Sequence, residues 1–118
     1  MLLDTNIVIG LLAGTDTTVA AFKAEQKPLA SCAVSIITRM EVLSWQGMTE
    51  EGAALASRLF SGLRVLPISD EIEAATIALR RRRKVKLPDA IIAATAQAHG
   101  LQLLTLDQGL LSVMNEAI

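Results

Sequence analysis

Four acidic side chains occupy positions at which a parallel α/β sheet would bring them together. They are Asp4, Glu41, Asp89 and Asp107, two placed directly after apolar stretches and two within helical ones. Carboxylates gathered in one cleft repel one another unless a cation lies between them. Because their hard oxygen ligands favour Mg²⁺ or Mn²⁺ over zinc, the pattern predicts a divalent metal site.

Two of these acids, Asp89 and Glu41, also have an ordinary structural explanation. Asp89 falls in the first turn of an expected helix, where a carboxylate suits the helix dipole. Glu41 lies on a mostly apolar helical face, so its charge needs either a metal or a partner such as Arg39. Asp4 and Asp107 follow two expected strands, and ligands bind at the carboxyl ends of parallel strands. Taken together, the four are interpreted as a metal pocket.

Positive charge is concentrated in one short segment, although the formal net charge is only −1. Between positions 80 and 86 lie six of the 11 basic residues: Arg80, Arg81, Arg82, Arg83, Lys84 and Lys86. A helix C-terminus suits one or two cations, and six exceed that need. The segment therefore predicts contact with phosphate or with an acidic stretch of a partner, and both interpretations stay open.

Extended and helical segments alternate along the chain. Apolar stretches predict strands at residues 1–4, 29–34, 64–68 and 101–104. Periodic stretches predict helices at residues 5–12, 16–25, 36–45 and 89–99, one from Thr49 to Gly62, one from Ser69 through the arginines, and a short one after Asp107. Apolar strands separated by helices predict a parallel sheet covered on both faces.

The length of 118 residues fits one domain, residues 1–118, with one core. No uncharged apolar run approaches the ~18 residues that span a bilayer. The first residues enter an expected strand without the pattern of a signal peptide, so we expect a cytoplasmic protein with no membrane contact. Hydrophobic residues make up 52% of this small chain, which predicts a homodimer, a protein partner or both.

Four motifs, in order along the chain, resemble those of PIN-domain ribonucleases. They are Leu3-Asp4-Thr5-Asn6, then Ser35 with Glu41-Val42-Leu43, then Leu87-Pro88-Asp89-Ala90-Ile91-Ile92-Ala93-Ala94-Thr95-Ala96, then Leu104-Thr105-Leu106-Asp107. More narrowly, the set resembles the VapC toxins of bacterial and archaeal toxin–antitoxin pairs. The resemblance spans nearly the whole chain, and the segment around Asp89 is its most specific part.

The resemblance implies an α/β fold, a PIN-like three-layer sandwich whose central parallel sheet has four or five strands with helices on both faces. It implies a pocket for Mg²⁺ or Mn²⁺ formed by Asp4, Glu41, Asp89 and Asp107, with polar support from Thr5, Asn6, Ser35 and Thr105. Many relatives carry a further acid three positions after the last of these aspartates, where this chain has Leu110. We therefore expect one complete metal site and a second site that lacks one of its acidic ligands.

The resemblance also implies an endoribonuclease that acts as a toxin, is silenced by a VapB-like antitoxin and hydrolyses RNA by metal-activated water, leaving a 5′-phosphate and a 3′-hydroxyl. The metal-free route through a cyclic phosphate lacks its pair of histidines, because His99 is the only one and is expected to cap a helix or face solvent. The candidates for RNA contact are Arg81, Arg82, Arg83, Lys84 and Lys86. Since aromatic residues make up only 3%, base stacking is not expected to carry recognition, and Trp45 is interpreted as a core or interface residue.

Two other functions stay open. One is a catalytically weak PIN fold that binds protein or RNA; loss of the pocket acids would indicate it, and all four are present. The other is a metal-dependent phosphatase, but a haloacid-dehalogenase-like enzyme would have a second aspartate at the place of Asn6.

Overall fold

Short apolar segments form a central parallel sheet in the computed structural model, which describes residues 1–116. The strands are β1 (Leu2–Leu3), β2 (Ala33–Ser35), β3 (Arg64–Leu66) and β4 (Leu103–Leu104). They lie in the order β3-β2-β1-β4, and every neighbouring pair is parallel. Within residues 1–116 the sheet thus has four strands, as predicted.

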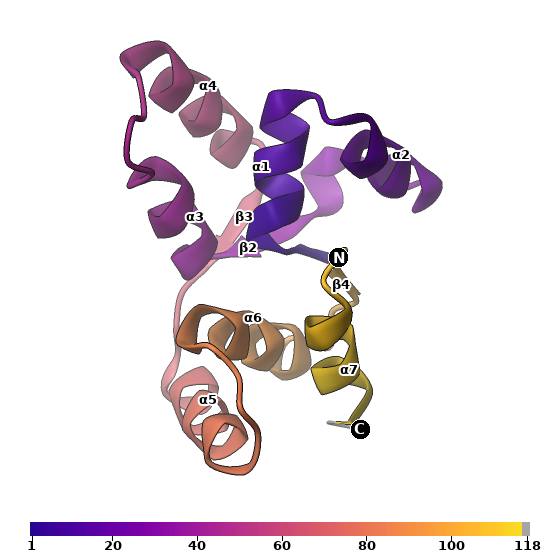
Figure 1. Cartoon of the computed structure of the whole chain (residues 1–118), viewed down its shortest axis with the longest axis vertical. Helices are drawn as coiled ribbons and strands as arrows, with labels where there is room; N and C mark the ends of the chain where they lie inside the picture. The colour runs from indigo at the N-terminus through magenta and orange to yellow at the C-terminus, as the bar shows by residue number, and fades with distance from the viewer. Residues whose placement is uncertain (117–118) are drawn as a thin grey trace.

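Helices cover both faces of this sheet and produce the predicted three-layer sandwich. They are α1 (Thr5–Ala13), α2 (Asp16–Ala24), α3 (Ile36–Leu43), α4 (Glu50–Ser61), α5 (Asp70–Arg82), α6 (Leu87–Ala98) and α7 (Gln108–Glu116). In Figure 1, α1 to α4 lie above the sheet and α5 to α7 below it. The acidic residues expected in the site lie within α3 and α6 and directly before α1 and α7, so both helical layers must contribute.

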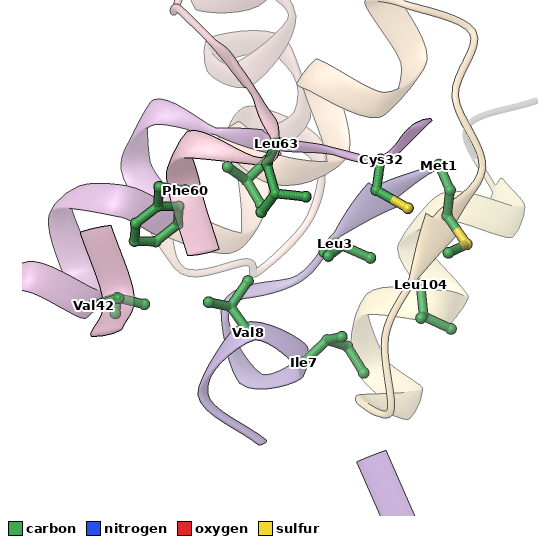
Figure 2. Close-up of a cluster of buried hydrophobic side chains, with 11 residues drawn as sticks. Met1, Leu3, Ile7, Val8, Cys32, Val42, Phe60, Leu63 and Leu104 are labelled. Atoms are coloured by element: carbon green, nitrogen blue, oxygen red, sulfur yellow. The ribbon is translucent and has the colours of Figure 1, made fainter. Parts of the chain in front are cut away.

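Successive strand residues face opposite layers, which divides the apolar interior into two cores. The upper core, shown in Figure 2, includes the buried side chains of Leu3, Ile7, Val8, Cys32, Val42, Phe60 and Leu104. The lower core includes those of Leu2, Ala33, Leu66, Leu79, Ile92, Leu103 and Leu110. Full burial of one large apolar side chain stabilises the fold by about 1.5–3 kcal/mol. Because both strand faces are buried, the sheet gives the backbone at its carboxyl edge a fixed position.

Helix ends lie close to where the sequence predicts them. Side-chain oxygens of Ser35, Thr49 and Ser69 accept hydrogen bonds from the first turns of α3, α4 and α5. Gly14 and Gly100 end α1 and α6 with φ of 69° and 61°, a left-handed conformation that costs glycine little. These local signals explain why the helix bounds were predictable.

The predicted strand over residues 29–34 is wrong in its first half. Leu29–Ser31 forms a short 3-10 helix instead, and β2 begins at Ala33. The carbonyl of Pro28 accepts hydrogen bonds from the Ser31 amide at 3.0 Å and from its hydroxyl at 2.7 Å, so the chain turns before it pairs. The other predicted strands are also shorter; β3 stops before Pro67, which has no amide to donate.

In the part of the chain that the structure describes, no single helix is long and apolar enough to cross a membrane. The pair α1 and α2 meets that criterion together, but the two helices are bent by 116° relative to each other.

Candidate metal centre

The predicted acids converge at the carboxyl edge of the sheet. Asp4 directly follows β1, Glu41 lies in the helix that follows β2, and Asp107 lies beyond β4. A cleft of about 390 Å³, here called the acidic cleft, is lined by Asp4, Thr5, Asn6, Ile9, Glu41, Ser44, Trp45 and Asp89. Three of the four predicted acids therefore share one cleft. Asp107 does not line it but lies close enough to raise the pKa of Asp4 and of Asp89.

The acids perturb one another's ionisation. Burial raises the pKa of Asp89, and the charges of Asp4, Asp107 and Glu41 raise it further, while Lys86 acts in the opposite direction. Burial also raises the pKa of Asp4, with a smaller contribution from the charge of Asp107. The cleft thus concentrates negative charge that its own residues do not neutralise, which is the condition that favours a bound cation.

Asp4 is the most firmly held of the four acids. Its side chain is 2% exposed. Its Oδ1 accepts a hydrogen bond from the Thr5 amide at 2.7 Å, and its Oδ2 accepts one from the Thr105 hydroxyl at 2.7 Å. These bonds oppose the effect of burial on the Asp4 pKa. Each carboxylate oxygen keeps a further lone pair, so a cation can still bind.

Glu41 is tied to the same point by a chain of hydroxyls. The Thr5 hydroxyl donates to Glu41 Oε1 at 2.8 Å and lies 2.9 Å from the Thr38 hydroxyl. Thr5 has one hydroxyl proton, so Thr38 is the donor in the second bond. Among residues 1–116 Arg39 makes no ion pair with Glu41, so the structure does not support that alternative.

Thr38 was not predicted from the sequence as a site residue. It is fully buried, and it precedes Glu41 by three residues on the same helix. That spacing, which places two side chains on one helix face, is the signal that would have identified it.

The other predicted polar residues have unequal positions. Asn6 is exposed and lines the acidic cleft, whereas Ser35 is fully buried and its hydroxyl caps α3. Asp107 is exposed, and its Oδ1 accepts a hydrogen bond from the Leu110 amide at 3.1 Å, at the start of α7. Leu110, at the place of the further acid seen in relatives, belongs to the lower core. This side of the site therefore has one carboxylate, as expected.

The donor set fits a hard divalent cation by type, since all its side-chain ligands would be carboxylate oxygens. Within residues 1–116, however, no three acidic, histidine or cysteine side chains lie close enough to hold one ion together. Binding an ion therefore requires the less buried acids, Glu41, Asp89 and Asp107, to turn toward Asp4.

A second cleft, of about 280 Å³ and here called the basic cleft, lies next to the first. It is lined by Arg83, Lys84, Val85, Lys86, Asp89, Asp107, Gly109, Leu110 and Val113. Asp89 lines both clefts. Of the five predicted RNA contacts, three line the basic cleft, whereas Arg81 and Arg82 are exposed in the last turn of α5. Arg83 also forms an ion pair with Glu116.

A third hollow, of about 260 Å³ and here called the apolar groove, runs between α1, the end of α3 and α4. Its lining comprises Ile9, Leu12, Ala13, Val42, Trp45, Met48, Gly52 and Leu55. Ile9 and Trp45 line the acidic cleft as well, so the two are continuous. Trp45 is 60% exposed, so of the two interpretations, core or interface, the structure contradicts burial in the core.

Comparison with known proteins agrees with this geometry. A family model described as the PIN domain matches residues 1–115. A chain of a toxin–antitoxin complex from Klebsiella pneumoniae is 40% identical over 90% of this chain and 85% of its own, with a TM-score of 0.75. FitAcB from Neisseria gonorrhoeae is 26% identical over 97% of this chain and 92% of its own, with a TM-score of 0.74. No curated protein matches the chain.

A more distant structure shares the fold alone. It is VapBC2 from Rickettsia felis, bound to a DNA fragment from its promoter. Its matching chain is 21% identical over 90% of this chain and 86% of its own, with a TM-score of 0.73.

Proposed function

Because the chain belongs to the PIN-domain family and is of the VapC type, we propose that it is a metal-dependent endoribonuclease, the toxin of a toxin–antitoxin pair. The observation that carries this proposal is the acidic cleft, where burial, together with neighbouring carboxylates, raises the pKa of Asp89 and of Asp4. Bound Mg²⁺ or Mn²⁺ would supply Lewis acidity and lower the pKa of water beside a phosphodiester.

The protein's own residues would prepare this site before RNA arrives. Thr5 and Thr105 fix the orientation of Asp4, so this ligand needs little reorganisation. The Thr5 hydroxyl also ties Glu41 to the start of α1. Asp89, in α6, and Asp107, in the loop before α7, would complete the ligand set. Without a cation, this cleft would repel the phosphate, so we expect no cleavage in metal-free solution.

We propose that the basic cleft holds a phosphate of the RNA that flanks the one to be cut. Its lysines, Lys84 and Lys86, are exposed, and it shares Asp89 with the acidic cleft. Lys84→Gln should weaken binding to all RNA sequences alike and reduce the slope of log affinity against log salt by about 1. Lys23→Gln, on the exposed surface of α2, is the matched control.

We propose that the apolar groove binds the antitoxin, since a 40% identical relative occurs in a toxin–antitoxin complex. Leu55, which is 48% exposed in the groove, should contact that partner. The candidate antitoxin is the protein encoded by the reading frame next to the one for this chain. Leu55→Glu should abolish co-purification with that protein, and unchanged co-purification would place the partner elsewhere.

We also retain the proposal of a homodimer, for which the exposed Met40 and its neighbours on α3 offer apolar surface. Light scattering after size-exclusion chromatography should give twice the chain mass, and a monomer at high concentration would contradict this proposal.

The decisive test of the catalytic proposal uses Asp4→Asn and Asp89→Asn. Wild-type protein should cut RNA with Mg²⁺ or Mn²⁺ and stop in EDTA. Either variant should lower the rate by more than about 100-fold, because removing even an outer-shell partner of a metal ligand costs 10–100-fold. Asp70→Asn, an exposed acid at the start of α5, should cut normally. Cleavage that persists in EDTA would contradict the metal mechanism.

A binding module with weak catalysis is the second candidate. It is favoured by one observation, that no three potential ligands within residues 1–116 lie close enough for one ion. Such a protein would bind RNA or its partner in Mg²⁺ or Mn²⁺ and leave the RNA intact.

A further inference from the structure

Trp45 is a large aromatic side chain exposed at the wall of the acidic cleft. It is 60% exposed and lines the cleft together with Asp4, Glu41 and Asp89. The chain has one Trp, two Phe and no Tyr, and both Phe side chains pack in or against the upper core. Within residues 1–116, Trp45 is therefore the only aromatic side chain that is placed to meet a ligand in this cleft.

We propose that the Trp45 indole stacks on a nucleobase adjacent to the scissile phosphate and positions the RNA for cleavage. This inference rests on the proposed ribonuclease function. The low aromatic content of the chain predicts that base stacking does not carry recognition. This inference differs from that prediction, because one exposed ring in the cleft is enough for one stacking contact. Bases of single-stranded RNA are free to stack on aromatic side chains, and every base offers a π-face for this.

Hydrogen bonds hold the backbone of Trp45 in a defined position. Trp45 lies in the connection between α3 and α4, where its amide donates to the Val42 carbonyl at 3.3 Å. Its own carbonyl accepts from the Met48 amide at 3.0 Å. Both bonds involve backbone atoms alone, so replacing the side chain leaves them intact. Substitutions of Trp45 should therefore report on ligand binding rather than on folding.

RNA is the occupant that the surroundings favour. Trp45 shares its cleft with the three carboxylates at which a phosphodiester would be cut. The base of the nucleotide next to that phosphate would therefore lie beside the indole ring. The exposed polar side chains of Asn6 and Ser44 line the same cleft and can hydrogen-bond a base edge or a ribose hydroxyl. An apolar segment of a protein partner would leave these polar groups and the acids unpaired.

Trp45 is the only tryptophan, so its fluorescence reports directly on the contact. The probe is a mixed-sequence single-stranded RNA of about ten nucleotides, within the site sizes of single-strand binding proteins, titrated with Ca²⁺ in place of Mg²⁺. We expect the RNA to quench the wild-type fluorescence. Trp45→Ala should weaken binding by about 5- to 150-fold, the range that loss of one stacked base gives, and Trp45→Phe should retain most of the affinity.

Cleavage kinetics in Mg²⁺ separate positioning from a structural role. Trp45→Ala should raise KM with little change in kcat, because stacking stabilises bound substrate and transition state alike. Ile77→Ala, at an exposed apolar residue of α5 outside the three hollows, should match wild type. Circular dichroism of each variant establishes that it is folded.

Each outcome decides the proposal. If wild type cuts RNA but Trp45→Ala keeps the wild-type KM, the stacking contact is refuted and the ribonuclease function stands. Equal losses in Trp45→Ala and Trp45→Phe would also overturn stacking, since phenylalanine still offers a ring. If Trp45→Ala instead lowers only the capture of the protein of the neighbouring reading frame, Trp45 is a protein contact. Wild type that neither binds nor cuts RNA refutes the proposed function itself.

Discussion

Single hydroxyl groups join parts of the candidate site that come from distant positions in the chain. The Thr105 hydroxyl donates to Asp4 Oδ2 at 2.7 Å and accepts from the Asp107 amide at 3.0 Å. One side chain at the end of β4 thus orients the acid that follows β1 and the loop that carries the fourth acid. The proposed activity should be sensitive to this hydroxyl, although it touches no substrate.

Thr105→Val tests this role with almost no change in side-chain shape. Losing the donor raises the pKa of Asp4 further, because the bond to Thr105 lowers it at present. RNA cleavage should fall about 10- to 100-fold, as for other outer-shell partners of metal ligands. The free energy of unfolding should fall by about 1–3 kcal/mol, because buried polar atoms lose their partners. Cleavage assays and urea unfolding measure the two effects.

Thr105→Ser provides the control, since it keeps the hydroxyl and should behave nearly like wild type. If Thr105→Val kept full activity, orientation of Asp4 would not depend on this bond.

At the residue scale, the sequence identifies the acids better than it identifies their partners. Asp4, Glu41 and Asp89 line one cleft, as expected of a pocket, because strand ends and helix faces follow from local patterns. The spacing of Thr38 to Glu41 is a local signal for a shared helix face, but the hydrogen bond that gives Thr38 its role is made with Thr5, 33 residues away. The exposure of Trp45 likewise depends on how α1 and α4 pack around it, which local sequence does not contain.

At the scale of elements, the close crossing of α1 and α2 depends on one glycine. A Cβ added to Gly10 would lie 2.6 Å from the Cβ of Thr18 and would also clash with the Thr18 hydroxyl. Thr18 is 4% exposed and cannot move into solvent. Gly10→Ala should therefore lower the free energy of unfolding by about 1–3 kcal/mol, the usual penalty for overpacking, as measured by urea denaturation.

Gly62→Ala is a matched control for that substitution. Gly62 has a negative φ of −88°, and an added Cβ would meet only the Leu59 carbonyl at 3.5 Å, an ordinary contact. We expect its stability to lie within about 1 kcal/mol of wild type. Equal effects of the two substitutions would show that the crossing of α1 and α2 tolerates a methyl group.

Helices were predicted from the sequence more accurately than strands. Their caps, such as Ser35 and Ser69, are local signals, so the predicted starts of α3 and α5 were confirmed. Strand ends depend instead on pairing between distant segments, and each strand is only two or three residues long. The apolar run that includes Leu29 predicts a strand, but the turn at Pro28 decides where pairing begins.

For the whole molecule, we expect the metal-free protein to lose stability as the pH rises, because Asp4 and Asp89 have raised pKa values in the folded state. The pKa values of Asp4 and Asp89 are raised above the ordinary value of 3.8 in the folded protein. Between that value and the raised ones, the folded state binds more protons than the unfolded state, so the free energy of unfolding decreases with increasing pH. Thermal melting in EDTA from about pH 4 upward measures this loss.

Asp89→Asn isolates the contribution of one acid. The variant should be more stable than wild type in EDTA at neutral pH, and its stability should fall less as the pH rises. Wild type should regain stability in Mg²⁺, by about 2.7 kcal/mol at 100 times its Kd, and the variant should gain less. If the free energy of unfolding depended on pH in the same way for both proteins in EDTA, the raised pKa of Asp89 would not be the cause of the loss of stability.

The bond between Thr105 and Asp4 spans 101 positions of the chain, and this has a consequence for synthesis. A growing chain that has just left the ribosome as far as α5 carries Asp4 and Glu41 but has no β4 to hold them. The site is therefore assembled only when nearly the whole chain has emerged. The proposed nuclease would therefore gain its complete site only at the end of its own synthesis, so its own messenger would be almost fully translated before cleavage began.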